Sequence, residues 1–244
     1  MSPEDVAARV AARLAAVRER IEAAATRAGR TTGEITLVGV AKRQPAEAVV
    51  AAVAAGLSDV AESFAQEARQ KIPVVNAALK DRGMAPPRWH FVGQLQRNKA
   101  RLVAPLCHQV QSLDRASLAE ELDRRASAAG RQLDVLLQVN LSDEPQKGGA
   151  DPAELPALLK RLSGCSSLHA RGLMTIPRAQ QDPELTRETF ARLRALRDHL
   201  CQRPEGHTLP ELSMGMTADF EVAIEEGATL VRVGTALFGP RPAP

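Results

Sequence analysis

The chain opens with apolar residues spaced as on one face of a helix. In residues 3–28, which are rich in alanine, arginine and glutamate, apolar side chains recur every three or four positions, at Val6, Val10, Leu14, Val17 and Ile21. This spacing predicts a long helix with an apolar stripe, and Gly29 supplies a stop. We expect residues 1–30 to form a helix packed on the rest of the molecule. The stripe could equally mediate association, but we predict a monomer.

After this helix, strand-like and helix-like segments alternate. Short apolar runs, typical of strands buried on both faces, occur at residues 35–40, 59–63, 89–93, 108–113, 134–140, 170–176, 211–215 and 230–234. Polar, alanine-rich stretches between them predict helices, among them 45–55, 115–129, 152–162 and 183–200. Eight such units predict an α/β fold in which residues 1–244 form a single (β/α)8 TIM barrel, one domain with an extra N-terminal helix. An open doubly wound sheet is the alternative, because two of the predicted strands are very short.

Composition and charge narrow the classes of partner. The chain carries 32 basic and 29 acidic residues, a formal net charge of +3, and only 2% aromatic residues. Nucleic-acid binding needs a concentrated basic face and often stacking aromatic side chains, so we expect no nucleic-acid partner. The N-terminal segment has frequent charges and no span of about 20 apolar residues, so neither a signal peptide nor a membrane anchor is predicted. These features indicate a cytoplasmic protein without a membrane partner.

The cysteines and histidines do not indicate a metal site. The three cysteines are far apart and show no CxxC spacing, which predicts neither a disulfide framework nor a zinc site. Four histidines lack ligand spacing to one another or to the cysteines: His108, His169, His199 and His207. We therefore predict no metal. The chain contains no tyrosine, which excludes any mechanism that needs a tyrosine base from this chain.

Candidate chemistry lies at the carboxyl ends of the predicted strands, which form the active face in barrels of this kind. Lys42 follows the run 35–40 directly, and Pro45 opens the next helix. Its aliphatic stem would then be packed while its amine faces the barrel mouth. A partly desolvated amine has a lowered pKa and can attack an aldehyde. From position alone, a surface lysine at a strand end is the commoner explanation.

The last two predicted strands end in segments suited to a phosphate group. Gly234 and Thr235 lie where a strand turns into a short helix, so that backbone N–H groups, a hydroxyl and a positive helix end point to one place. Ser213 can offer a hydroxyl to the same phosphate, and Thr217 is expected to cap a helix over 217–226. An ordinary tight turn and a structural serine are the alternative explanations.

Arg232 is expected to be an interior arginine. It alternates with Val231 and Val233 along the last predicted strand, so it should project into the barrel while the valines face the helices. An arginine in that position needs a partner, which makes Arg232 a candidate for binding a ligand.

Together these segments resemble the YggS/PROSC family of pyridoxal phosphate homeostasis proteins, which are similar in fold to the barrel domain of alanine racemase. The resemblance is carried, in order, by VGVAKRQP, AESFAQEA, WHFVGQLQRNK, SLDR, LLQVNLSDEPQKGG, RGLMTIP and LSMGMTADFEVAIEEGATLVRVGTALFG. It implies an alanine racemase N-terminal domain-like barrel that binds pyridoxal 5'-phosphate (PLP). It also implies that Lys42 is the Schiff-base lysine, that Arg232 faces the ring nitrogen, and that Ser213, Gly234 and Thr235 hold the phosphate.

The chain departs from the family pattern at two positions. The family usually has GEN(Y/F)VQE after the second strand, and here Ser63 takes the place of the asparagine. A second lysine often stands two residues after the Schiff-base lysine, where this chain has Gln44, so Lys147 or Lys99 is the candidate for a transfer amine. A histidine flanked by aromatic residues is more often a hydrogen-bonded core residue than a functional one. Three residues at or near strand ends are nevertheless expected near the cofactor: Ser63, His90 and Met214.

These features favour a PLP-binding protein of intracellular PLP homeostasis, which stores, buffers or delivers the cofactor held as a Schiff base on Lys42. A protonated Arg232 leaves the ring nitrogen unprotonated and weakens the cofactor as an electron sink. No tyrosine base exists, and the chain ends soon after the eighth strand, without room for the domain that closes the site in related racemases. We therefore predict no dedicated catalytic residues. The alternatives are a PLP-dependent amino-acid racemase of low activity and a Schiff-base aldolase or sugar-phosphate enzyme. Expected partners are PLP-dependent apo-enzymes or a vitamin B6 kinase or oxidase.

Overall fold

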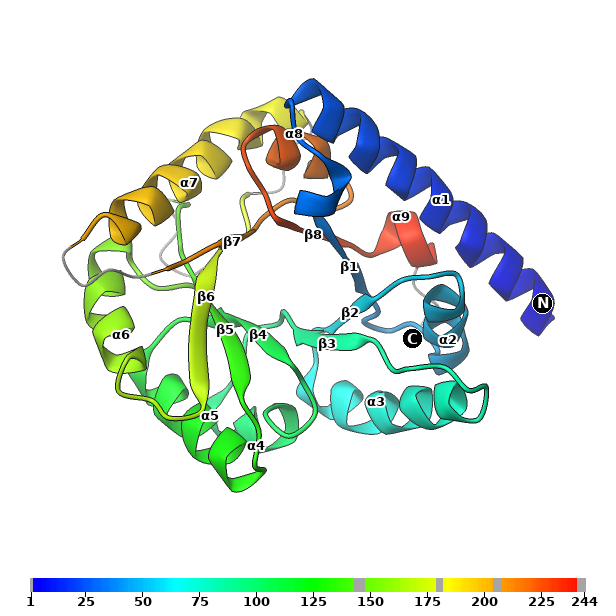
Figure 1. Cartoon of the computed structure of the whole chain (residues 1–244), viewed down its shortest axis with the longest axis horizontal. Coiled ribbons are helices and arrows are strands. Elements are labelled where there is room, and N and C mark those ends of the chain that lie inside the picture. The colour runs from blue at the N-terminus through cyan, green and yellow to red at the C-terminus, as the bar shows by residue number, and fades with distance from the viewer. Residues whose placement is uncertain (1, 143–147, 179–181, 204–207, 241–244) are drawn as a thin grey trace.

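Eight parallel strands close into one barrel in chain order, and helices surround it (Figure 1). The structure is a computed structural model that describes residues 2–142, 148–178, 182–203 and 208–240. The strands are β1 (Thr36–Val40), β2 (Asp59–Glu62), β3 (Arg88–Phe91), β4 (Gln109–Leu113), β5 (Leu133–Gln138), β6 (Leu168–Met174), β7 (Glu211–Ser213) and β8 (Leu230–Val233). Because β1 pairs with both β2 and β8, the sheet is closed. The predicted barrel is confirmed, and the open doubly wound sheet is excluded.

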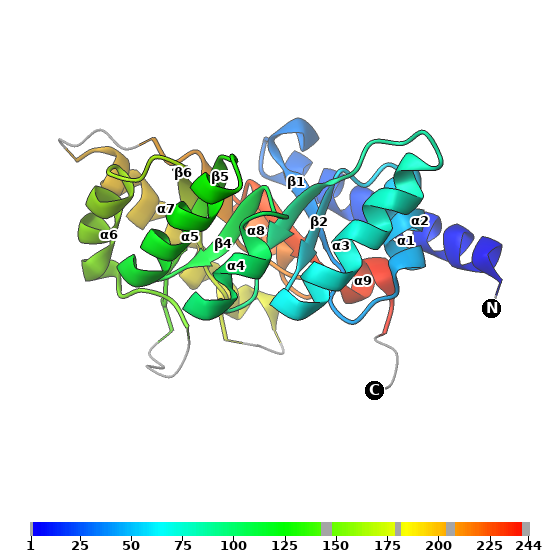
Figure 2. The ribbon, with the colours of Figure 1, turned by 90° about the horizontal axis from the view of Figure 1, so that it is seen from below.

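The helices cover the outside of the barrel, as Figure 2 shows from the side. They are α1 (Pro3–Arg27), α2 (Ala46–Ala54), α3 (Ala65–Lys80), α4 (Ala100–Val103), α5 (Ala116–Ala128), α6 (Leu155–Leu162), α7 (Arg187–Cys201), α8 (Phe220–Glu225) and α9 (Thr235–Phe238). The helices predicted over 45–55 and 115–129 agree with α2 and α5 to within one residue at each end. Those predicted over 152–162 and 183–200 begin with a 3-10 turn that continues into α6 and α7.

The helix predicted over 217–226 begins later than expected. α8 starts at Phe220, and Thr217 does not cap it, so that prediction is wrong. The carboxylate of Asp219 accepts a hydrogen bond from the Met216 amide at 2.7 Å, which folds the chain into a turn before the helix can begin. The Thr217 hydroxyl instead accepts a long bond of 3.5 Å from the Ala236 amide. Thr217 is thereby placed at the mouth of the barrel.

The apolar stripe of α1 packs on the outside of the barrel against α2, α8 and α9 (Figure 1). Val10, Leu14, Val17 and Ile21 are each at most 5% exposed, so the stripe is covered within the chain. At the start of the helix, the Ser2 hydroxyl accepts a hydrogen bond from the Asp5 amide, which satisfies a free backbone donor. Among the described residues, no helix is long and apolar enough to cross a membrane.

The inside of the barrel has an apolar part and a polar part. Side chains point alternately inward and outward along a strand. The inward ones include a small apolar cluster, separate from the main core between strands and helices: Val38, Ala61, Val92 and Leu230. On the other side, buried polar side chains are hydrogen-bonded to one another across strands: Asp59, His90, Gln109, Gln111, Ser213 and Arg232. Buried polar groups are stable only when they find such partners. This network determines where several of the predicted site residues lie.

Candidate cofactor-binding site

A pocket of about 290 Å³ opens at the carboxyl end of the barrel. Five of the eight predicted residues line it: Lys42, Ser63, Arg232, Gly234 and Thr235. The remaining lining residues are Val40, Val92, Ile176, Met216, Thr217 and Ala218. Closure of the barrel explains the grouping, because β8 lies beside β1 and brings Gly234 and Thr235 to the same pocket as Lys42.

Lys42 stands immediately beyond the end of β1. The Ala41 amide donates to the Ala61 carbonyl at 2.8 Å, which extends the pairing of β1 with β2 by one residue. The Gln44 amide then donates back to the Ala41 carbonyl at 3.0 Å and closes a tight turn around Lys42. Lys42 is half-buried and lines the pocket, as expected of a lysine whose stem is packed against the barrel.

Arg232 projects into the barrel as predicted, whereas Val231 and Val233 belong to the outer core. It is 4% exposed, and two interior groups hold its guanidinium. Nη1 donates to the Ser213 hydroxyl at 2.6 Å, and Nη2 donates to the Thr175 carbonyl at 2.9 Å. An arginine with two fixed partners has little rotational freedom, so it presents one orientation to the pocket.

Burial decides the electrostatics of Arg232. Loss of water lowers its pKa to about 10, and the nearby Asp219 carboxylate acts in the opposite direction. The guanidinium therefore still carries its proton at neutral pH. Burial raises the pKa of Asp219 in turn, while its bond from the Met216 amide works against that rise. The pocket thus contains a buried fixed cation from Arg232 beside the primary amine of Lys42.

The part of the pocket formed by the ends of β7 and β8 can hold an anion. Gly234 and Thr235 form the start of α9, where the first backbone N–H groups have no acceptor within the helix. Thr217 and Ala218 line the same pocket from the loop after β7. Gly215 permits that loop, because its φ of +88° is one that residues with a side chain rarely adopt. Two hydroxyls and several backbone amides therefore meet at the ends of β7 and β8, where barrels commonly bind phosphate.

Ser63 reaches the pocket through a close contact between two loops. A Cβ at Gly93 would lie 2.0 Å from the Ser63 carbonyl oxygen, so only glycine allows the chain after β3 to approach the chain after β2 this closely. Ser63 is half-buried there. A short hydroxyl thus occupies the place at which an asparagine was expected from the family pattern.

Three predicted site residues do not line the pocket. Ser213 is fully buried, and its hydroxyl donates to Gln111 at 2.7 Å while it accepts from Arg232. Met214, the next residue along the strand, points outward into the main core. His90 is 1% exposed, and its two ring nitrogens lie 2.8 Å from Asp59 and 2.9 Å from Gln109. The structure therefore places Ser213 behind Arg232 and outside the pocket lining, and His90 within the interior network.

We predict that Ser213→Ala weakens cofactor binding through Arg232. The substitution removes a hydrogen bond to a buried charged group, and such a bond is worth about 1.5–3 kcal/mol, so we expect a loss in affinity of about tenfold or more. Equilibrium titration with PLP measures it. The matched control is Ser112→Ala, because Ser112 is also a buried strand serine but its hydroxyl has no hydrogen-bond partner among the described residues. Equal losses in both variants would contradict the role of Ser213.

The candidate transfer amines are not at the pocket in the described part of the chain. Gln44 is buried, and its side-chain amide Nε2 donates to the Gly239 carbonyl at 3.4 Å. This bond connects the Lys42 turn to the end of α9. Lys99 lies in a short 3-10 helix, Arg97–Lys99, outside the pocket lining. Lys147 falls outside the described residues.

The sequence did not single out Met216, Thr217 and Ala218 as residues that line the pocket. The preference of phosphate for the loop after the seventh strand of a barrel was a signal for them.

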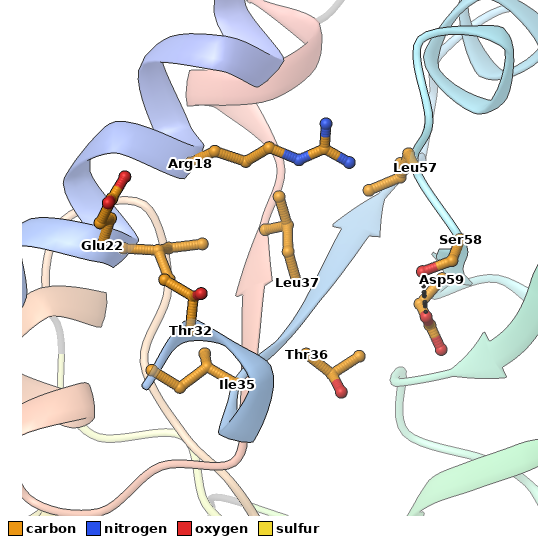
Figure 3. Close-up of a pocket in the computed structure, with 10 residues that line it drawn as sticks. Arg18, Glu22, Thr32, Ile35, Thr36, Leu37, Leu57, Ser58 and Asp59 are labelled. Carbon is orange, nitrogen blue, oxygen red and sulfur yellow. Dashed lines mark hydrogen bonds between the residues drawn. The ribbon is translucent and has the colours of Figure 1, made fainter. Parts of the chain in front are cut away.

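A second pocket of about 450 Å³ lies at the other end of the barrel (Figure 3). It is enclosed by the starts of β1 and β2 and by α1, and its charged groups are Arg18, Glu22 and Asp59. Asp59 accepts a hydrogen bond from Ser58 at 2.7 Å, drawn as a dashed line in Figure 3. No residue predicted to bind the cofactor lines this pocket. Two carboxylates also make it a poorer place for a phosphate than the mouth of the barrel.

Comparison with known proteins defines the class of this barrel. The family model of the alanine racemase N-terminal domain matches residues 12–242, which is nearly the whole chain. The fold is therefore the alanine racemase N-terminal domain barrel, and the match includes most of the helix α1.

More similar proteins narrow this class to one family. The pyridoxal phosphate homeostasis protein of Aquifex aeolicus is 43% identical over 229 residues, which cover 94% of this chain and 97% of that protein. The corresponding protein of Pseudomonas aeruginosa is 44% identical, with 95% and 96% covered. The solved structure of PipY from Synechococcus elongatus, with PLP bound, superposes with a TM-score of 0.80 at 36% identity, covering 94% of this chain and all of that one. The chain belongs to the pyridoxal phosphate homeostasis protein family.

Proposed function

We propose that this protein binds PLP, attached covalently to Lys42, and that it stores, buffers or delivers the cofactor inside the cell. The observation that carries the proposal is the joint placement of Lys42, Arg232, Gly234 and Thr235 around one pocket at the mouth of the barrel. An amine, a buried cation and a loop of hydroxyls and backbone amides match three polar groups of the cofactor: its aldehyde, its ring nitrogen and its phosphate.

The residues present fit PLP in both charge and size. The pocket of about 290 Å³ is close to the lower end of the range usual for small-ligand sites, about 300–1,000 Å³. Val40, Val92 and Ile176 provide apolar surface for a flat ring. Thr217, Thr235 and the amides at the start of α9 would hold the phosphate, and Arg232 would approach the ring nitrogen. When bound, PLP would supply an aldehyde, and Lys42 would be the amine that holds it covalently, with loss of water.

Arg232 favours a carrier over an enzyme. Its guanidinium remains protonated and is held by Ser213 and Thr175, so it donates hydrogen bonds and supplies no proton to the ring nitrogen. Electron withdrawal by the ring is then weak. No tyrosine exists in the chain to act as a second base, and His90 is committed to Asp59 and Gln109 inside the barrel. The lining residues therefore bind and orient the cofactor and include one evident base, Lys42.

Transfer and turnover assays test the proposal together. We expect the PLP-loaded protein to reactivate a PLP-dependent apo-enzyme, and a vitamin B6 kinase or oxidase to reload the empty protein. Incubation with L-alanine in deuterated water should give little deuterium at Cα and little D-alanine. Racemisation at an ordinary enzymatic rate of about 1 per second or more would contradict a carrier. Failure of the apo-enzyme to recover activity would contradict delivery of the cofactor by this protein.

The proposal also includes the cellular location of the protein, which we propose to be the cytoplasm.

A further inference from the structure

A largely buried cluster of three ionisable side chains, Glu62, Glu67 and Lys71, lies between β2 and α3, directly behind the turn that carries Lys42. The ammonium of Lys71 donates to Glu62 at 2.7 Å and to Glu67 at 2.6 Å. The Lys71 side chain is 8% exposed, and that of Glu62 is completely buried. Alternation along β2 explains the position of Glu62, because Ala61 points into the barrel and Glu62 therefore faces α3.

The cluster holds both peptide groups that flank Lys42. Lys71 also donates to the Ala41 carbonyl at 2.8 Å, which belongs to the peptide before Lys42. Glu67 accepts from the Arg43 amide at 2.7 Å, which belongs to the peptide after Lys42. The backbone of Lys42 is thus bound on its two sides by two neighbouring side chains of one helix.

The turn needs such support. Arg43 has a φ of 59°, and it is the only described residue other than glycine with a positive φ. That conformation is unfavourable for a residue with a Cβ and persists only where surrounding contacts impose it. Burying Lys71 and Glu62 is also unfavourable, because both lose water. The strained backbone of Arg43 and the buried charges of the cluster are both unfavourable, and they lie next to each other. The hydrogen bonds from Lys71 to Ala41 and from Arg43 to Glu67 connect them.

Resting on the proposed function, we propose that Lys71, Glu67 and Glu62 are positioning residues that hold the backbone of Lys42 so that its amine points into the pocket. None of the three lines the pocket, so they act on the cofactor through Lys42. Lys71 itself is engaged by two carboxylates and a carbonyl, which keeps the second lysine of this region from competing as an attacking amine.

Comparing the binding of two ligands distinguishes a cluster that positions Lys42 from one that supports the whole pocket. PLP has an aldehyde that bonds to Lys42, whereas pyridoxine 5'-phosphate has an alcohol in its place and uses only the ring and phosphate contacts. Loss of the cluster should therefore weaken PLP and leave pyridoxine 5'-phosphate unchanged. A collapse of the pocket would weaken both.

The test measures both dissociation constants, and the yield of borohydride-reduced adduct, in the full-length protein and in Glu67→Ala. Glu67 is the most exposed member of the cluster, at 23%, so its substitution is the least damaging to the core. We expect the affinity for PLP to fall about tenfold, the effect of one lost hydrogen bond to a charged group, with the affinity for pyridoxine 5'-phosphate retained. Glu67→Gln should restore part of the loss, because its carbonyl oxygen still accepts from Arg43. Glu47→Ala, an exposed glutamate of α2, is the control that should bind both ligands as wild type does.

Two results would overturn the inference: unchanged PLP binding and adduct yield in Glu67→Ala, or an equal loss for both ligands. The proposed function fails in a different way. In that case the wild-type protein forms no adduct at Lys42 and binds PLP no better than pyridoxine 5'-phosphate.

Discussion

Lys42→Ala is expected to abolish the covalent attachment of PLP. The wild-type protein loaded with PLP should absorb near about 420 nm, as lysine-bound PLP does in general, and the variant should lack that band. Borohydride reduction of the wild type should attach the cofactor irreversibly to the peptide that contains Lys42. The loss should be complete, because no other lysine lines the pocket in the described part of the chain.

Non-covalent binding should remain in this variant. Arg232, Thr217 and Thr235 are untouched, so ring and phosphate contacts are retained and affinity for pyridoxine 5'-phosphate should be close to that of wild type. Lys99→Ala is the matched control, since this lysine lies outside the pocket and should leave the band intact. A reduced covalent adduct in Lys42→Ala would show that a different lysine carries the cofactor. A band that is present in the wild type and lost in Lys42→Ala would exclude the Schiff-base aldolase on the same scaffold.

The second large effect is a pH dependence of stability that originates at Glu62. Burial raises the pKa of Glu62 to about 7 despite the attraction of Lys71, and Glu67 adds repulsion. One of its carboxylate oxygens has no hydrogen-bond partner among the described residues, which penalises the ionised form further. The folded protein therefore binds this proton more tightly than the unfolded chain does.

The sign follows from linkage. Between the unfolded pKa of 4.5 and the folded pKa of about 7, the folded state retains a proton that the unfolded state has lost. The free energy of unfolding should thus fall as pH rises through this window, by up to about 1.4 kcal/mol per pH unit from this group, and level off above it. The other titratable groups near Glu62 are Lys71 and Glu67 on α3 and Cys107 before β4. Cys107 remains a neutral thiol here, because burial raises its pKa to about 12.

Denaturant unfolding at pH 5, 6, 7 and 8 measures this effect as the difference between wild type and Glu62→Gln. The amide does not titrate, so the variant should gain stability relative to wild type as pH rises from 5 to 7. Glu47→Gln on the exposed face of α2 should follow the wild-type curve. A constant difference between wild type and Glu62→Gln across this range would show that Glu62 is ionised throughout.

Local patterns predicted the architecture well because the strands are short, mostly buried segments that alternate with polar, alanine-rich helical stretches. All eight predicted runs overlap the strands β1–β8, and Lys42 stands at the end of β1 as expected. Alternation along β8 correctly turned Arg232 inward, since side-chain direction in a strand depends only on position. The same alternation applies to the end of β7. Because Ser213 points into the barrel, the next residue, Met214, must point outward.

Other site residues depend on contacts between distant parts of the chain. Ser213 binds Gln111, which is 102 residues earlier, and Arg232 binds the Thr175 carbonyl, which is 57 residues earlier. Nothing near Ser213 in the chain distinguishes a hydroxyl that holds an arginine from one that holds a phosphate. The same is true of His90, whose partners Asp59 and Gln109 lie on the two neighbouring strands.

The amino-acid sequence by itself determined the strand and helix order, the inward arginine, the lysine at a strand end and the resemblance to a cofactor-binding family. These depend on periodicity and on short motifs, which are local properties. Only the tertiary structure decided which polar groups reach the pocket and which satisfy one another inside the barrel, because each buried donor must find an acceptor on another strand. It also revealed that Lys71 and Glu67 hold the peptides on both sides of Lys42, a contact made because α3 lies beside the turn that follows β1.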